Sequence, residues 1–246
     1  MTNFEPLNDS YDEATAMKAI GVALTEFYES LTRALDDINI EKILKRKNPY
    51  LYRARGICSA RQIIEEILSA YVSSSQETIF GNVFFEPVTL ALSGGYQLFA
   101  EGIDIMVDKG DTMYGIVVKS GTSVNADSRK RQEQSFQAAQ KRVRRYKQAF
   151  VPVVGYGYGH KRKYQSSGRP YIELAGQDFW HWLTGDPEFY TKIIRYMGTR
   201  PDEYAKKFEE AYANAENRLL REFTAKYCDK SGAIDWDTLV KFNSGN

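Results

Sequence analysis

The chain has 246 residues, of which 43% are hydrophobic and 26% are charged, a balance that is ordinary for a soluble globular protein. That length allows one well-buried domain, or one domain with a helical appendage. Only Cys58 and Cys228 are present, which excludes a disulfide framework and a cysteine-based metal site. No segment approaches the roughly 20 apolar residues of a membrane span, and we see no signal peptide. We therefore expect a cytoplasmic protein with no membrane contact.

The charges are unevenly distributed along the chain, although 33 basic and 32 acidic residues leave a net charge of only +1. Residues 128–150 contain eight Lys or Arg side chains against the single acid Glu133, and Lys161, Arg162 and Lys163 form a second basic cluster. A protein with one basic side suits a polyanion bound in a cleft. The alternative is a solvated helix face, which is what most charge runs are.

The N-terminal part of the chain is predicted to be helical. Residues 11–37 have apolar residues at helical spacing, which indicates one long amphipathic helix. Ser59 with Gln62 three residues later is a capping-box signature that predicts the start of another helix. We expect the serines at 73–75 to end that helix, and a further helix over 77–92 to be broken by Pro87.

Strands dominate the middle of the sequence. Residues 101–120 predict a β-hairpin that turns near Gly110, and a polar loop over 120–127 leads into a basic helix. Two buried strands are expected at 151–158 and 170–175. The remainder is predicted to be helical, at 177–183, 187–197, 202–228 and 236–242. This order predicts an α/β (α+β) protein with a central mixed β-sheet flanked by helices and with helical N- and C-terminal regions.

The hairpin brings one acid and one base together. With a turn near Gly110, Val117 lies opposite Asp104, and Lys119 falls on the Asp104 side as a diagonal neighbour. Phosphodiester hydrolysis needs a carboxylate to hold Mg2+, an activated water, and a cation near the water or the phosphate. Asp104 and Lys119 would supply two of these, and the alternative is an ordinary cross-strand ion pair.

A second acid must come from outside the hairpin. Endonucleases built on such a hairpin usually carry an acid two residues before the lysine, and here Val117 occupies that position and cannot ligate a metal. One candidate is Glu133, which extends the apolar stripe of the basic helix by one turn. The other is Glu86, where the preceding helix bends toward the sheet. Each has an alternative reading as a structural acid.

Several motifs share their order and spacing with a known family. The chain resembles the PD-(D/E)XK type II restriction endonucleases, and within them the PmeII-like group. The motifs are NPYLYRAR at 48–55, SSSQETIFG at 73–81, EGID at 101–104, VKSG at 118–121, GQDFW at 176–180 and GAIDW at 232–236.

The resemblance implies a restriction-endonuclease-like fold and a mechanism. Asp104 matches the metal-binding aspartate and Lys119 the catalytic lysine. Glu133 lies 14 residues after the lysine, where some restriction enzymes carry the missing acid, and Glu86 stays open as the other candidate metal ligand. The implied activity is Mg2+-dependent hydrolysis of both strands of duplex DNA at a specific palindromic site, leaving 5′-phosphates, with Mn2+ as a possible substitute.

The resemblance also implies partners. These are double-stranded DNA, a second copy of the chain in a homodimer, and a cognate DNA methyltransferase for self-protection. We expect a single endonuclease domain over 1–246, with a helical part (1–75), a catalytic core (76–176) and a second helical part (177–246). The loop at 122–128 departs from close relatives, so the recognition sequence is not transferable. The expected DNA-binding residues are Ser123, Asn125, Asp127, Arg129, Lys130, Arg131, Lys161, Arg162 and Lys163.

Three other functions remain open at this point. A repair or mobile-element nuclease with the same core would cut by DNA structure instead of sequence. A DNA-binding protein that has lost catalysis is consistent with Val117. A helical scaffold protein would explain the two ends of the chain but would leave the hairpin and the basic helix without a purpose.

Overall fold

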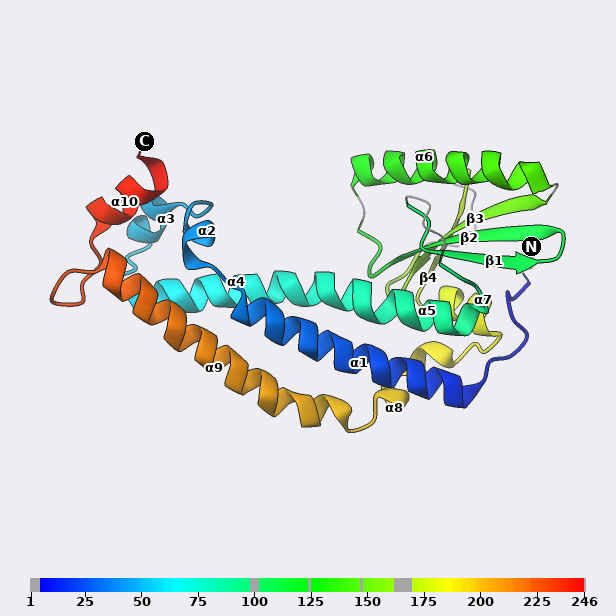
Figure 1. Ribbon diagram of the computed structural model, residues 1–246, viewed down its shortest axis with the longest axis horizontal. Coiled ribbons are helices and arrows are strands. Elements are labelled where there is room, and N and C mark those ends of the chain that lie inside the picture. The colour runs from blue at the N-terminus through cyan, green and yellow to red at the C-terminus, as the bar shows by residue number, and fades with distance from the viewer. Residues whose placement is uncertain (1–4, 98–101, 124, 147, 162–169, 246) are drawn as a thin grey trace. The chain divides into compact units, whose positions relative to one another are not determined.

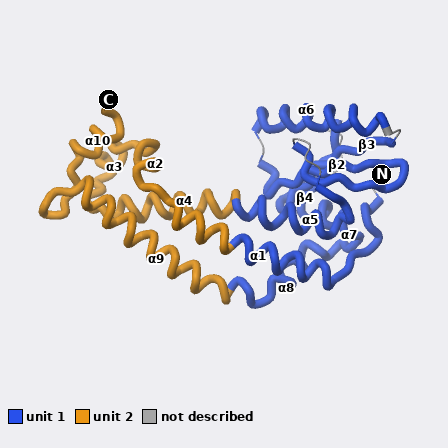
Figure 2. Tube along the Cα trace, in the orientation of Figure 1, with its two compact units in different colours: residues 1–27, 79–201 blue, residues 28–78, 202–246 orange. Residues whose placement is uncertain are grey.

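The computed structural model describes residues 5–97, 102–123, 125–146, 148–161 and 170–245. The chain divides into two compact units (Figure 2), of which unit 1 comprises residues 1–27 and 79–201 and unit 2 comprises residues 28–78 and 202–246. Each unit has its own hydrophobic core. No helix in the described part of the chain is long and apolar enough to cross a membrane.

A four-stranded mixed sheet forms the centre of unit 1. Its strands are β1 (Ile105–Lys109), β2 (Thr112–Lys119), β3 (Ala149–Tyr156) and β4 (Ile172–Ala175), in the order β1-β2-β3-β4. The first pair is antiparallel and the other two pairs are parallel. The sheet has helices on both faces, so the predicted fold class is confirmed. Because β2, β3 and β4 run in one direction, their carboxyl ends meet at one edge of the sheet.

The hairpin has the predicted register. Gly110 occupies the turn with a φ of +66°, a conformation that glycine adopts without strain. Ile105 pairs with Ile116, so the next step of the register sets Asp104 against Val117. The alternation of side chains between the two faces of the sheet ends before Ile105. Ile103 packs on the same face as Met106, whereas regular alternation would place it with Ile105 on the opposite face. The chain therefore leaves regular strand geometry at Asp104.

Two layers of helices cover the sheet (Figure 1). One face carries α6 (Ala126–Val143), whose apolar stripe of Phe136, Ala139 and Val143 packs on β2 and β3 residues such as Val117 and Val154. The other face carries a π-helical turn, η1 (Gly81–Phe85), and the helices α5 (Glu86–Ser93), α7 (Gln177–Thr184) and α8 (Phe189–Met197). The core on that side includes Phe84, Phe179, Trp180 and Phe189, each at most 1% exposed.

Unit 2 is built from helices among its described residues, with one isolated β-bridge between Cys228 and Ile234. It contains α2 (Ile40–Leu44), α3 (Pro49–Ala54) and α10 (Trp236–Ser244), together with most of α4 (Ala60–Phe80) and α9 (Arg200–Tyr227) and the end of α1 (Glu13–Asp36). Asn48 caps α3 by accepting a hydrogen bond from the backbone N–H of Leu51. Pro49 follows in the first turn, where a missing N–H does no harm.

Two predicted helix boundaries are wrong. The serines at 73–75 do not end a helix, because α4 continues to Phe80. Serine is tolerated on an exposed helix face, and here Thr78 donates its hydroxyl proton to the backbone oxygen of Ser74, one turn back. Pro87 does not break a helix in its middle either. It lies in the first turn of α5, immediately after the π-helical turn.

Candidate active site

Asp104 and Lys119 lie together where β1 begins and β2 ends. The Oδ2 atom of Asp104 accepts a hydrogen bond of 2.7 Å from the backbone N–H of Val118, next to the lysine. The backbone N–H of Asp104 in turn donates to the oxygen of Ile116 at 3.0 Å. These two bonds hold the half-buried carboxylate at a fixed position on the hairpin. The side chain of Lys119 is exposed and, among the described residues, its ammonium group forms no hydrogen bond or ion pair.

Glu86 is the carboxylate that the fold brings to this pair. It is the first residue of α5, and its Oε1 atom accepts a hydrogen bond of 3.1 Å from the side chain of Gln97. Burial raises the pKa of Glu86, and the negative charge of Asp104 raises it further, while Gln97 and Lys119 oppose the shift. Burial also raises the pKa of Asp104, against the Val118 N–H and the charge of Lys119. Glu86, Asp104 and Lys119 therefore form one electrostatically coupled group.

The two carboxylates suit a hard divalent cation. Mg2+ takes oxygen ligands and is commonly bound by one or two carboxylates, with water completing the coordination. A cation between Glu86 and Asp104 would offset the loss of hydration that raises both pKa values and the negative charge of Asp104 that raises the pKa of Glu86 further. Within the described residues there is no group of three or more Asp, Glu, His or Cys side chains that could hold a metal. Glu101 lies outside the described residues.

Glu133 is not brought into this group. It lies on α6 one turn before Phe136, as the apolar stripe predicts, and is half-buried. In the described part of the chain its carboxylate forms no hydrogen bond or ion pair, and it is not among the charges that shift the pKa of Asp104 or Glu86. Of the two candidates for the second acid, Glu86 is therefore the one that the fold places beside Asp104.

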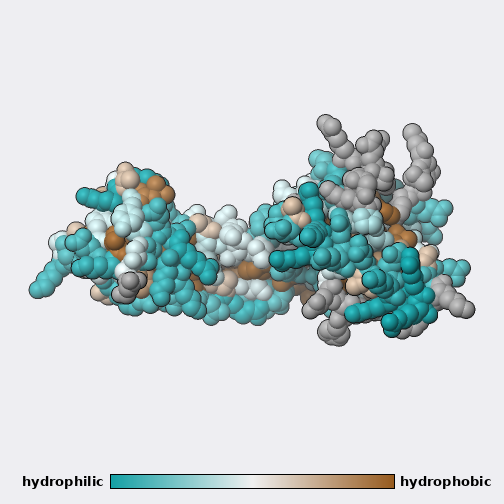
Figure 3. Space-filling model, turned by 90° about the horizontal axis from the view of Figure 1, so that it is seen from above, coloured by the Kyte–Doolittle hydropathy of each residue, from teal (hydrophilic) through white to brown (hydrophobic). Residues whose placement is uncertain are grey.

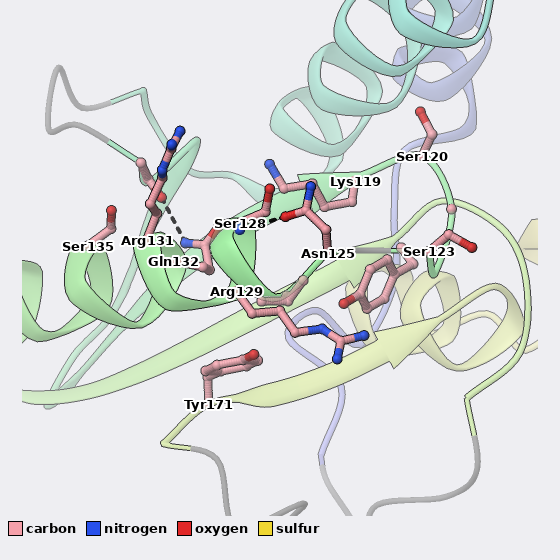
Figure 4. Close-up of a pocket in the computed structure, with 14 residues that line it drawn as sticks. Lys119, Ser120, Ser123, Asn125, Ser128, Arg129, Arg131, Gln132, Ser135 and Tyr171 are labelled. Carbon is pink, nitrogen blue, oxygen red and sulfur yellow. Dashed lines mark hydrogen bonds between the residues drawn. The ribbon is translucent and has the colours of Figure 1, made fainter.

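A polar cavity of about 490 Å³ opens beside Lys119 (Figure 4). It lies between the end of β2, the loop that follows, the first turns of α6 and the strands β3 and β4. Asn125 caps α6 by accepting a hydrogen bond of 2.8 Å from the Ser128 N–H, and Gln132 donates to the backbone oxygen of Gly102 at 3.0 Å. Arg129 extends from α6 toward the strands and Tyr171. The lining residues with polar side chains are Lys119, Ser120, Ser123, Asn125, Ser128, Arg129, Arg131, Gln132, Ser135, Tyr156 and Tyr171.

The expected DNA-binding residues fall into four groups. Ser123, Asn125, Arg129 and Arg131 line the cavity, whereas Asp127 and Lys130 are exposed on α6 and do not. Lys161 forms an ion pair of 2.6 Å with Glu173, and its ammonium group lies 4.6 Å from the centre of the Tyr156 ring. Arg162 and Lys163 lie outside the described residues.

The sequence patterns did not single out two residues that line or support the cavity. Tyr156 lies in a strand that reads as uniformly buried, and it is indeed only 2% exposed. Its hydroxyl donates a hydrogen bond of 2.7 Å to Glu173, which comes from the neighbouring strand. The interactions of the Glu173 carboxylate could not be predicted from the sequence, because its partners become neighbours only when β3 and β4 pair. A charged residue within the short apolar strand at 170–175 was the one available clue.

The comparison with known families decides the class of protein. A model of the type II restriction endonuclease EcoO109I family matches residues 15–209, which is more than half of the chain. The chain belongs to this family. No curated protein matches it. As a type II restriction endonuclease EcoO109I family member the chain is a nuclease and a DNA-binding protein, and the matched residues include Glu86, Asp104, Lys119 and the polar cavity.

Proposed function

We propose that this restriction endonuclease is a Mg2+-dependent enzyme of the PD-(D/E)XK type that cleaves both strands of duplex DNA at a specific palindromic site. The observation that supports the proposal is the convergence of Glu86, Asp104 and Lys119, two acids and one base, at the open end of the hairpin. The matching family supports a nuclease in general. The PmeII-like subgroup, 5′-phosphate products and activity with Mn2+ are part of the same proposal.

Each of the three residues has a distinct role in this mechanism. Asp104 and Glu86 would hold the metal ion, which when bound neutralises charge on the phosphate and acidifies a water molecule. The Val118 N–H keeps the Asp104 carboxylate oriented, so little reorganisation precedes binding. Lys119 has no competing partner among the described residues, and its ammonium group would orient the attacking water or stabilise negative charge on the scissile phosphate.

Glu133 is retained as a second candidate for the missing acid. Its half-buried place on the α6 stripe supports this alternative, as does its position 14 residues after Lys119. Glu86 is favoured because its charge interacts with both Asp104 and Lys119. Substituting the two acids one at a time separates these assignments.

The partners follow from the chemistry of a palindromic substrate. A palindromic DNA site has two-fold symmetry, which matches a protein with two-fold symmetry. We therefore propose a homodimer in which each copy cuts one strand. Host DNA must be protected from such an enzyme, which calls for a cognate DNA methyltransferase. In this proposal both compact units serve a single endonuclease domain over residues 1–246.

Digestion of unmethylated phage DNA tests the function. Wild type should give discrete fragments only with Mg2+ or Mn2+, and Asp104→Asn and Lys119→Met should each lower the rate by roughly 10²- to 10⁴-fold, the usual range for a group that acts on the reacting atoms. Glu86→Gln should lower the rate in the same range, whereas Glu133→Gln, a matched change, should leave it within about threefold of wild type.

Each alternative function predicts a different result. Wild type that binds DNA without cutting it in either metal would indicate a binding protein. Cutting only at branched or flapped DNA would indicate a repair enzyme. A loss of activity in Glu133→Gln but not in Glu86→Gln would reassign the second acid.

A further inference from the structure

The polar cavity beside Lys119 has an unusual charge. Three of its lining side chains are cationic, Lys119, Arg129 and Arg131, and no carboxylate lines it among the described residues. The remaining polar lining consists of Ser, Asn, Gln and Tyr side chains, which donate or accept hydrogen bonds without adding charge. A volume of about 490 Å³ is ample for a phosphate group and part of its sugar. The cavity therefore suits an anion.

Arg129 is incompletely satisfied in the protein alone. Its Nε atom is buried and has no hydrogen-bond partner. Such an orphaned donor costs free energy, because water has been removed and nothing replaces it. Within the described residues, no hydrogen bond or ion pair reaches the rest of the guanidinium either. Figure 4 shows the side chain held against the strands, with its terminal nitrogens directed toward the cavity.

The surrounding network keeps the Arg129 charge available. Arg129 acts electrostatically on Tyr156, whose hydroxyl proton is already donated to Glu173. Burial and this carboxylate raise the pKa of Tyr156, so the hydroxyl stays neutral. Lys161 binds the same Oε1 atom of Glu173 at 2.6 Å and offsets the negative charge of this acid. Lys161 thus acts here as a counter-ion within the protein.

We propose that the cavity binds a phosphate group of the DNA backbone, with Arg129 as its principal ligand. The planar guanidinium offers paired N–H donors that match two phosphate oxygens. A phosphate is favoured over a base edge because the charged side chains that line the cavity among the described residues are all cationic, whereas a base is neutral. The proposal rests on the proposed function only in taking DNA as the substrate, and it needs neither the metal nor cleavage.

Equilibrium binding to a pool of random-sequence DNA duplexes, in EDTA and at several salt concentrations, tests this site. Arg129→Gln should weaken binding roughly tenfold and should lower the slope of log affinity against log salt by about 1, the loss of one phosphate contact. The control is Arg142→Gln, the same change on the same helix, at an exposed position that does not line the cavity. It should change affinity by less than about threefold.

Each further outcome decides for or against the site. Equal losses in Arg129→Gln and Arg142→Gln would overturn the proposal, because they would reflect only the overall charge of α6. An unchanged salt slope with altered sequences among the bound duplexes would also overturn it, in favour of a base contact. If Arg129→Gln fails to fold, Arg129→Lys takes its place, and binding at least threefold weaker than wild type despite the retained charge supports the bidentate ligand. Wild type that never cuts DNA but shows this Arg129 dependence would refute the proposed function and leave the phosphate site standing.

Discussion

Charged residues are paired in unit 2 and left unpaired at the candidate active site of unit 1. In unit 2 the charges pair within the protein, as in Arg55 with Glu66 and Lys226 with Glu41, both at 2.6 Å. At the candidate active site in unit 1, Lys119 and Arg129 form no ion pair with a described residue, and the acids Glu86 and Asp104 repel each other. Unsatisfied charge of this kind is typical of sites that receive a ligand. The difference supports the proposal that the chemistry takes place in unit 1.

The pKa shifts express the same contrast. The ammonium group of Lys226 hydrogen-bonds to Glu41 in unit 2 and lowers the pKa of that carboxyl. Burial and the charge of Asp104 raise the pKa of Glu86 in unit 1. Folding therefore favours the charged form of one glutamate and the neutral form of the other.

The largest effect on stability is expected from the core of unit 2. Phe223 is 0% exposed, and Phe223→Ala should lower the free energy of unfolding by about 3 to 5 kcal/mol through the cavity it creates. Urea unfolding measures this change, with Tyr50→Ala as the control, because Tyr50 is an aromatic residue of the same unit that is 62% exposed. Folded Phe223→Ala should cut DNA at the wild-type rate. Loss of DNA cleavage in the folded variant would contradict the proposal that the chemistry takes place in unit 1.

A smaller effect is expected from the metal ion. Mg2+ at about 100 times its dissociation constant should stabilise the wild type by about 2.7 kcal/mol, since it binds the folded state alone. For a chain of this length each kcal/mol raises the melting temperature by about 2 to 4 °C. Calorimetry should show that Asp104→Asn abolishes the increase, whereas Asp108→Asn, which changes an exposed acid on the strand that follows Asp104, keeps it. An equal increase in both variants would mean that the metal binds elsewhere.

The smallest effect distinguishes the two glutamates by its sign. The raised pKa of Glu86 means that its contribution to stability is favourable below the ordinary pKa of 4.5 and is lost as the pH rises through the folded-state value. Without metal at neutral pH, Glu86→Gln should therefore raise the melting temperature. The lowered pKa of Glu41 means that its contribution is present above 4.5 and is lost as the pH falls through the folded-state value. Glu41→Gln should lower the melting temperature at neutral pH. A shift of the melting temperature in the same direction in both variants would contradict the difference between the two glutamates.

Local signals predicted most of the fold. The turn at Gly110 fixed the hairpin register, and the capping box at Ser59 and Gln62 marked the start of α4, where the backbone N–H of Ser59 donates to Gln62. The predicted strands and C-terminal helices agree with the structure to within a few residues. The short helix α3 was missed, although Asn48 followed by Pro49 is itself a start signal. The π-helical turn had no usable signal, because its hydrogen-bond shift depends on packing around Phe84 and Phe85.

The candidate site was predictable where it depends on the hairpin and less so elsewhere. The proximity of Asp104 and Lys119 could be predicted from the two-residue repeat of a strand and from the position of one turn, which are both local properties of the sequence. Sequence reasoning gave Glu86 and Glu133 equal standing, since the choice depends on where α5 starts after the π-helical turn. The pairing of Lys161 with Glu173 requires β3 and β4 to be neighbours. From the sequence alone, a basic residue in a charged run is therefore interpreted as a DNA contact, because its long-range partner is not yet known.

The chain crosses between the two units within helices, at 27/28 in α1, 78/79 in α4 and 201/202 in α9. Arg218 donates a hydrogen bond to the backbone oxygen of Leu35, and Asn243 donates to that of Leu44, contacts that span 183 and 199 residues. During synthesis, the first half of unit 2 therefore emerges from the ribosome with its apolar face uncovered. It stays so until unit 1 has been translated and the last helices arrive. Such late contacts slow folding and prolong the exposure of apolar surface during synthesis.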